Sequence, residues 1–221
     1  MIWLGIDGAL GAFSAAVVDS TDAFPPRTAT ASGNDALERG LTLVDEVLGG
    51  LDFDSVGAIA VGTGPGGFTG LRIALSYAKG LAFAARLPLV GVSSYDALTP
   101  PRPADTHVTF VHGRAGIACA RLRVRSAGAT RTDHVACGSY AALVEALEAA
   151  VPTDGCIAAY GNAAGAASAF GERFPNVIST QDESTVPAAA IVRFAIAAGT
   201  LGSAHVLRAD YGEAHYAERA P

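Results

Sequence analysis

The stretch VGTGPGGFTGLRIALSYAKGLAFAARLPLVGVSSYDAL, residues 61–98, predicts a strand end, a glycine-rich turn, a long helix and another strand, in that order. The turn is GTGPGG, residues 62–67, and the helix is expected over residues 69–86. Thr69 can cap the start of this helix, and Pro88 ends it because proline cannot continue the helical hydrogen bonding. Apolar runs on both sides of the helix predict buried strands, which is typical of an α/β sheet.

The helix expected over residues 69–86 is apolar around an unusually wide arc. Its charged residues, Arg72, Lys79 and Arg86, fall together on the narrow remainder of the helix. A surface helix normally has an apolar stripe a little over 100° wide, and this arc is about twice that. We therefore expect one side of the helix to face its own sheet and another to face a neighbouring helix or a second protein. The apolar arc includes Gly70, Leu71, Ala74, Leu75, Ala78, Leu81 and Ala82.

The chain opens with a predicted hairpin. The apolar run 2–6 stops at Asp7, and a second run, residues 13–18, follows a short turn of small residues. The tip of this hairpin is therefore acidic and carries a glycine. A helix is expected over residues 34–48, where apolar residues recur at helical spacing. These residues are Leu37, Leu41, Val44 and Leu48.

A proline cluster just after residue 99 predicts a subdomain boundary. We expect one subdomain over residues 1–99 and a second over residues 100–221, where strands and helices alternate again. Together the two halves predict an α/β protein with mixed sheets flanked by helices. The second half is expected to contain strands over 108–111, 117–124 and 156–160, and helices over 140–150 and 186–199.

Composition narrows the class of protein. The chain has 221 residues and a net charge of −6, so it has no overall attraction to a phosphate backbone, and a basic partner should hold most of any RNA. Cys119, Cys137 and Cys156 are widely spaced, which indicates small buried apolar residues in a reducing compartment. With no signal peptide and no apolar run long enough to span a bilayer, we expect a soluble, cytoplasmic protein.

Two features could bind an anion or a metal. A glycine-rich turn between a strand and a helix can point backbone amides at a phosphate, and an acidic residue such as Asp7 can hold a metal through water. The candidate residues are Asp7, Gly64, Gly66 and Gly67. The alternative, a tight turn that brings the helix close to the sheet, is favoured about two to one. Neither the histidine spacing nor the serine contexts predict a metal site or a nucleophile, so no catalytic group emerges.

Residues 61–98 closely resemble the signature segment of the TsaB (YeaZ) family. That family shows G-P-G-S/G-F-T-G-L-R-x-G, then A-K-G-L-A, then P-L-x-G-V-S-S/T, and the match runs for almost forty residues without a gap. The opening strand with Asp7 fits less closely, because Gly8, Ala9 and Leu10 replace the usual small polar turn. The second half resembles the family mainly in its length and element order.

The resemblance implies an actin-like ATPase (ASKHA) fold of two subdomains. It also implies a non-catalytic subunit that pairs with TsaD through helices of its N-terminal half and is joined by the ATPase TsaE. TsaD transfers the threonylcarbamoyl group to the adenosine beside the tRNA anticodon. The tRNA would be reached through the complex, ATP or ADP could bind in or near it, and a homodimer could use the same surface. The implied interface is Leu37, Leu41, Val44, Gly70, Leu71, Ala74, Leu75, Ala78, Leu81 and Ala82.

A comparison with TsaD-like proteins supports a non-catalytic role. Those proteins carry the metal ligands H-x-x-x-H just after the corresponding strand. Here the two positions are occupied by Ser94 and Leu98, and leucine cannot ligate a metal.

Three alternatives remain open from the sequence. The first is an ASKHA-fold kinase or nucleotide hydrolase that uses Asp7 and the glycine-rich turn. The second is a glycoprotease, the older label of the superfamily, which lacks support from metal ligands or a nucleophile. The third is a homodimeric scaffold with a different partner.

Overall fold

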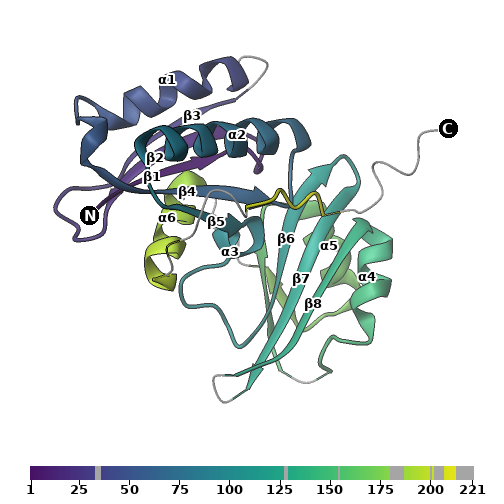
Figure 1. The fold of residues 1–221 in the computed structure, drawn as a ribbon. Coiled ribbons are helices and arrows are strands. Elements are labelled where there is room, and N and C mark those ends of the chain that lie inside the picture. Colours follow the sequence, from purple (N-terminus) through teal and green to yellow (C-terminus); the bar gives the residue numbers. More distant parts are fainter. Residues whose placement is uncertain are drawn as a thin grey trace. The chain divides into compact units, whose positions relative to one another are not determined.

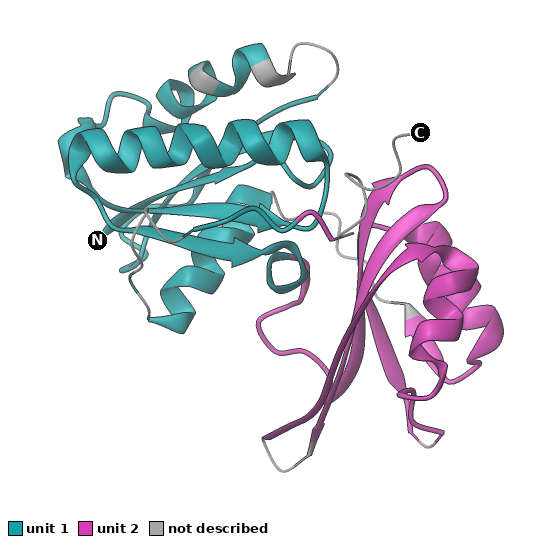
Figure 2. Cartoon of the chain, turned by 45° about the vertical axis from the view of Figure 1, so that its right-hand side comes forward, with its two compact units in different colours: residues 1–97, 184–210 teal, residues 98–183, 211–221 magenta. Residues whose placement is uncertain are grey.

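A computed structural model describes residues 1–32, 36–126, 129–153, 155–179, 187–199, 201 and 207–212. The chain forms two compact units, each built on its own sheet (Figure 2). Unit 1 comprises Met1–Ala97 and Ser184–Asp210, and unit 2 comprises Leu98–Glu183 and Tyr211–Pro221. No helix among the described residues is long and apolar enough to cross a membrane.

Unit 1 contains a five-stranded mixed sheet in the order β3-β2-β1-β4-β5 (Figure 1). The expected opening hairpin is present, with β1 antiparallel to β2 and Asp7 opposite Ser14. On its other side β1 is parallel to β4, which in turn is parallel to β5. The strands are β1 (Ile2–Asp7), β2 (Phe13–Asp19), β3 (Arg27–Ala31), β4 (Val56–Gly64) and β5 (Leu89–Ser93).

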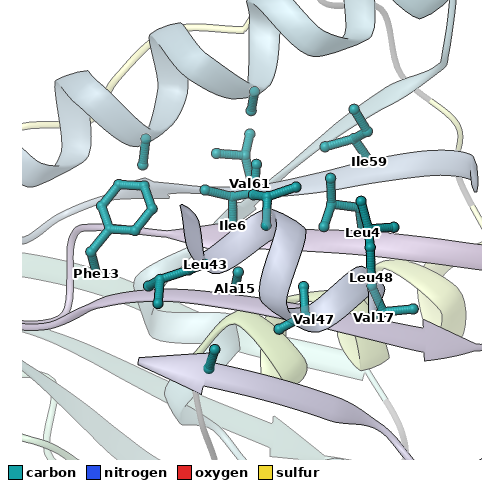
Figure 3. Packing of buried hydrophobic residues seen from close by; sticks show 14 of the residues in the cluster. Leu4, Ile6, Phe13, Ala15, Val17, Leu43, Val47, Leu48, Ile59 and Val61 are labelled. Atoms are coloured by element: carbon teal, nitrogen blue, oxygen red, sulfur yellow. The ribbon is translucent and has the colours of Figure 1, made fainter. Parts of the chain in front are cut away.

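Helices cover both faces of this sheet. Successive side chains of a strand point to opposite faces, so Leu4 and Ile6 pack under α1 and α2, whereas Trp3 packs against α6. Figure 3 shows the first of these two layers, in which Phe13 and Leu43 lie close together. The helices of unit 1 are α1 (Ala36–Leu48), α2 (Phe68–Ala85), α3 (Ser94–Leu98) and α6 (Pro187–Ala198), with a short 3₁₀ turn, η1 (Phe53–Ser55).

Helix α6 corrects the expected division of the chain. The sequence-based boundary assigned all of residues 100–221 to the second subdomain, but α6 packs on β1, β2 and β4 of unit 1. The close approach is possible because Gly5 has no side chain: a Cβ there would clash with the backbone carbonyl of Ala188. The start of α6 is also tied to the sheet, since Ala188 N donates a hydrogen bond to Ser14 Oγ at 3.2 Å.

Unit 2 contains a second five-stranded sheet, in the order β10-β9-β6-β7-β8. Helices α4 and α5 pack on one face, where Phe110, Phe170 and Leu143 are fully buried. The elements are β6 (Thr106–Arg114), β7 (Ile117–Ser126), β8 (Ala129–Ser139), α4 (Tyr140–Glu148), β9 (Ile157–Gly161), α5 (Ala164–Arg173) and β10 (Val177–Ser179).

The interpretation of the cysteines as small buried apolar residues was wrong for two of the three, because Cys119 is buried but Cys137 is half-buried and Cys156 is exposed. Cys119 and Cys137 lie directly opposite each other on β7 and β8 and form a disulfide, while Cys156 is an exposed free thiol. The pair is separated by 18 residues in sequence, and only the antiparallel register of the hairpin brings the two sulfurs together. Cysteine usage therefore gives no support to a reducing compartment.

Candidate functional site

Asp7 and the glycine-rich turn lie side by side in unit 1. Strands β1 and β4 are parallel neighbours, so their carboxyl ends lie at the same edge of the sheet. Contact between them is direct, because a Cβ at Gly62 would clash with Asp7 Oδ1. The structure thus brings together the residues that the sequence singled out for anion or metal binding.

The carboxylate of Asp7 is fully buried. Its Oδ2 accepts hydrogen bonds from the amides of Ala9, at 3.2 Å, and Leu10, at 3.1 Å, while Oδ1 has no hydrogen-bond partner among the described residues. Burial raises the pKa of Asp7 from 3.8 to about 7, although the two amide hydrogen bonds oppose this rise. Asp7 therefore organises the tip of the hairpin from inside the protein.

The turn packs against this hairpin tip through backbone atoms. The amide of Gly67 donates to the carbonyl of Ala9 at 2.7 Å, and a Cβ at Gly66 would clash with that same carbonyl. A Cβ at Gly70, in the first turn of α2, would clash with the carbonyl of Gly8. The glycines of this region thus allow two backbone segments to touch.

Gly64 makes a similar contact with the segment Leu207–Asp210. It has a φ of +95°, and a Cβ there would clash with the carbonyl of Asp210. Asp210 N donates to Thr63 O at 2.7 Å, and Lys79 Nζ donates to Leu207 O at 2.6 Å. Each candidate cofactor residue therefore has contacts within its own chain. These contacts favour close packing as the role of the turn. Nucleotide binding stays a prediction.

Ser94 and Leu98, which the sequence comparison set against the H-x-x-x-H positions, lie on α3. Ser94 is buried, with no hydrogen-bond partner for its Oγ among the described residues, and Leu98 is half-buried. Across the described part of the chain, no three side chains of His, Cys, Asp or Glu come together in a way that could hold a metal ion.

Most of the residues expected at a partner interface are in the core of unit 1, which corrects that assignment. A buried side chain packed on its own sheet cannot also contact a partner. Gly70 and Leu81 are half-buried, and the side chains of Leu37 and Leu41 lie outside the described residues. The buried ones are Val44, Leu71, Ala74, Leu75, Ala78 and Ala82.

The opposite side of α2 is the exposed one. We call it the outer α2 face and define it by Thr69, Ile73, Ser76, Gly80 and Phe83, which follow one another at helical spacing. Phe83 is 75% exposed and Ile73 is 37% exposed. A Cβ at Gly80 would meet nothing described within 4 Å. The wide apolar arc in the sequence predicted that this helix has a second apolar side, but not which residues occupy it.

Comparisons with known proteins agree with this architecture. A family model described as TsaD, tRNA N6-adenosine threonylcarbamoyltransferase, matches residues 33–198. This chain belongs to that family. Curated relatives named tRNA threonylcarbamoyladenosine biosynthesis protein TsaB are 44% identical over 63 residues in Haemophilus influenzae and 44% identical over 59 residues in Escherichia coli. The resemblance to the TsaB (YeaZ) family is thereby confirmed.

The extent of these matches differs. The curated TsaB alignments cover 28% and 26% of this chain, and they span only about a quarter of each relative, 27% and 26%. The solved structure of YeaZ from Pseudomonas aeruginosa covers 95% of this chain and 99% of that one, with a TM-score of 0.71 and 24% sequence identity. It shows the fold, and the expected actin-like ATPase architecture is confirmed.

The backbone contact at the start of α2 generates a first prediction. Gly70→Ala should destabilise the protein by about 1–3 kcal/mol, because the new methyl group meets a backbone carbonyl that cannot move aside easily. Gly80→Ala, in the same helix but in open space, should stabilise it by up to about 1 kcal/mol. Urea unfolding of both variants measures the difference, and equal effects would show that the contact with Gly8 does not constrain the helix.

The buried carboxylate generates a second prediction. Its folded-state pKa of about 7 lies above the unfolded value, so the folded protein holds an extra proton between about pH 4 and pH 7. The contribution of the Asp7 carboxyl to the free energy of unfolding is therefore fully present near pH 4. It is lost as the pH rises toward 7, by up to about 1.4 kcal/mol per pH unit. Asp7→Asn should remove that slope in urea unfolding, whereas the exposed control Asp54→Asn should keep it. The same pH dependence in wild type and Asp7→Asn would contradict this assignment.

Proposed function

We propose that this chain is a non-catalytic partner subunit in the biosynthesis of threonylcarbamoyladenosine in tRNA, and that it docks a TsaD-type protein on its outer α2 face. The observation that carries the proposal is an exposed, partly apolar helix face in a chain of this family. The names of the TsaB relatives supply the pathway. The TsaD-type partner and the later recruitment of a TsaE-type ATPase belong to the proposal.

The outer α2 face has the side chains that a helix–helix contact needs. Ser76 and Gly80 are small and four residues apart, so the backbone of a second helix can come close. Ile73 and Phe83 flank them as exposed apolar side chains that a partner could bury. Large aromatic residues often supply most of the binding energy in such interfaces. A homodimer could use the same face, and this is an alternative that the experiment separates.

The absence of chemistry in the chain itself is part of the same proposal. Leu98 stands where TsaD-like proteins place a metal ligand, which supports a subunit without the TsaD metal site. The closed packing around Asp7 also gives no support to a kinase or hydrolase, since the carboxylate is fully buried. On this proposal the modifying reaction takes place in the TsaD-type partner.

The proposal is tested by introducing charge on the outer α2 face. Phe83→Glu and Ile73→Glu should each weaken binding to the TsaD-type protein of the same organism by about tenfold or more, because a carboxylate would have to lose its water in an apolar contact. Phe194→Glu is the matched control. Phe194 is an aromatic residue of α6 that is 39% exposed, so this variant should leave the affinity unchanged. Isothermal titration calorimetry gives the affinities, and circular dichroism checks the fold.

Two results would contradict the proposal. One is unchanged affinity for the TsaD-type protein in both α2 variants. The other is a wild-type chain that forms only a homodimer and no complex with that protein in gel filtration.

A further inference from the structure

The outer α2 face has basic residues along one of its long edges. Arg72, Lys79 and the C-cap residue Arg86 recur every seven residues, so they lie nearly in line along the helix. We call these three residues the basic border. Each of them stands three or four residues from Ser76 or Phe83, which belong to the outer α2 face. Because α2 contains no aspartate or glutamate, this edge carries charge of one sign.

The basic border lies on the side of α2 that faces the segment Leu207–Asp210. Lys79 Nζ donates to Leu207 O at 2.6 Å, and Figure 1 shows this segment on the side of α2 away from α1. Lys79 is half-buried at this contact, whereas Arg72 and Arg86 are exposed. The two arginines are therefore the members of the basic border that a partner can reach.

The opposite edge of the outer α2 face is next to α1. Helices α1 and α2 lie side by side over the same face of the sheet (Figure 1). Tyr77 is four residues from Ile73 and three from Gly80, so it marks the edge of the outer α2 face opposite the basic border. Burial raises the pKa of Tyr77, and the negative charge of Asp45 on α1 raises it further, which places Asp45 close to this edge.

Glu38 extends the negative charge along α1. It precedes Asp45 by seven residues, so both lie on the same side of α1, and both are exposed. We call Glu38 and Asp45 the acidic border. The outer α2 face, apolar at Ile73 and Phe83, therefore lies between two lines of opposite charge.

The helix dipole accounts for only part of the basic border. A helix favours acidic side chains near its N-terminus and basic ones near its C-terminus, and Arg86 fits this rule. Arg72 does not, because it is the fifth residue of α2 and follows a first turn without acidic residues. Its Cζ lies 5.2 Å from the centre of the Phe68 ring, a contact that holds the guanidinium and leaves its charge in place. Recognition of a partner accounts for a cation at this position.

We propose that the partner surface on the outer α2 face is acidic where it meets Arg72 and Arg86 and basic where it meets Glu38 and Asp45. The inference rests on the proposed function and adds the chemistry of the partner surface. Complementary charges around an apolar centre speed association and fix the orientation of the partner. A partner turned by 180° in the plane of the face would bring like charges together. The two borders therefore select one orientation.

Charge reversal of one border at a time tests the inference. Surface plasmon resonance gives the association rate constant with the TsaD-type protein of the same organism over a salt series. Arg72→Glu with Arg86→Glu should lower this constant about tenfold or more at low salt, because the variant repels an acidic edge. Glu38→Lys with Asp45→Lys should lower it to a similar extent, because it repels a basic edge. Both differences from wild type should shrink as salt rises, since exposed charges are screened.

Matched controls make the same changes in net charge at other exposed positions of unit 1. Arg39→Glu with Arg193→Glu matches the basic border, and Glu46→Lys with Asp54→Lys matches the acidic border. Glu46 lies about 100° from Asp45 around α1, and Arg193 is on α6, which packs on the other face of the sheet. Each control should change the association rate constant by less than about twofold.

Neutral variants give a second measurement that introduces no new charge. Arg72→Gln with Arg86→Gln, and Glu38→Gln with Asp45→Asn, should each make the dependence of the association rate constant on salt less steep. Circular dichroism checks that every variant is folded. A rate constant that rises in either reversal variant would overturn the inference, because the partner would then carry one sign of charge over both borders. Reversal variants that match their controls would also overturn it.

Failure of this inference is distinct from failure of the proposed function. A wild-type chain that forms no complex with the TsaD-type protein contradicts both. A complex that depends on Ile73 and Phe83 but on neither border contradicts only the proposed charge pattern.

Discussion

The backbone contact between the tip of the β1–β2 hairpin and the first turn of α2 determines which side of α2 faces the sheet and which side faces outward. Gly8 and Gly70 touch through backbone atoms, and the amide of Gly67 donates to the carbonyl of Ala9. No side chain could be accommodated at the two touching glycines, so the start of α2 is fixed at this point on the sheet. Once the helix is fixed there, one side of it must face the sheet and the opposite side must face outward.

The same constraint explains how a glycine-rich turn can serve close packing in this chain. Strand-to-helix turns of this kind bind phosphate when their amides point into open space. In this chain the hairpin tip occupies part of that space. The buried Asp7 stabilises the tip by accepting hydrogen bonds from two of its amides. Asp7 and the glycine-rich turn thus contribute to packing within the chain. The surface that we propose for partner binding is the outer α2 face on unit 1.

The sequence predicted the parts of the fold with strong local periodicity and missed those that depend on distant contacts. The opening hairpin, β4, the turn, α2 and β5 follow from apolar patterns and turn residues. The return of α6 to the first sheet could not be read locally, since it depends on a distant glycine, Gly5. Strand β8 was missed because it is a largely exposed edge strand without an apolar pattern, and α5 because alanine and glycine give little periodicity. The wide arc of α2 predicted a second face, yet only the structure shows that Leu71 points inward and Phe83 outward.

The most direct test of the account is whether a TsaD-type protein covers the outer α2 face. Ser76 is exposed at the centre of that face, so Ser76→Cys in a Cys156→Ser background places one accessible thiol there. The account predicts that adding the TsaD-type protein slows maleimide labelling of this thiol about tenfold or more, the protection expected of a buried interface core. A labelling rate that stays the same at saturating partner would contradict it.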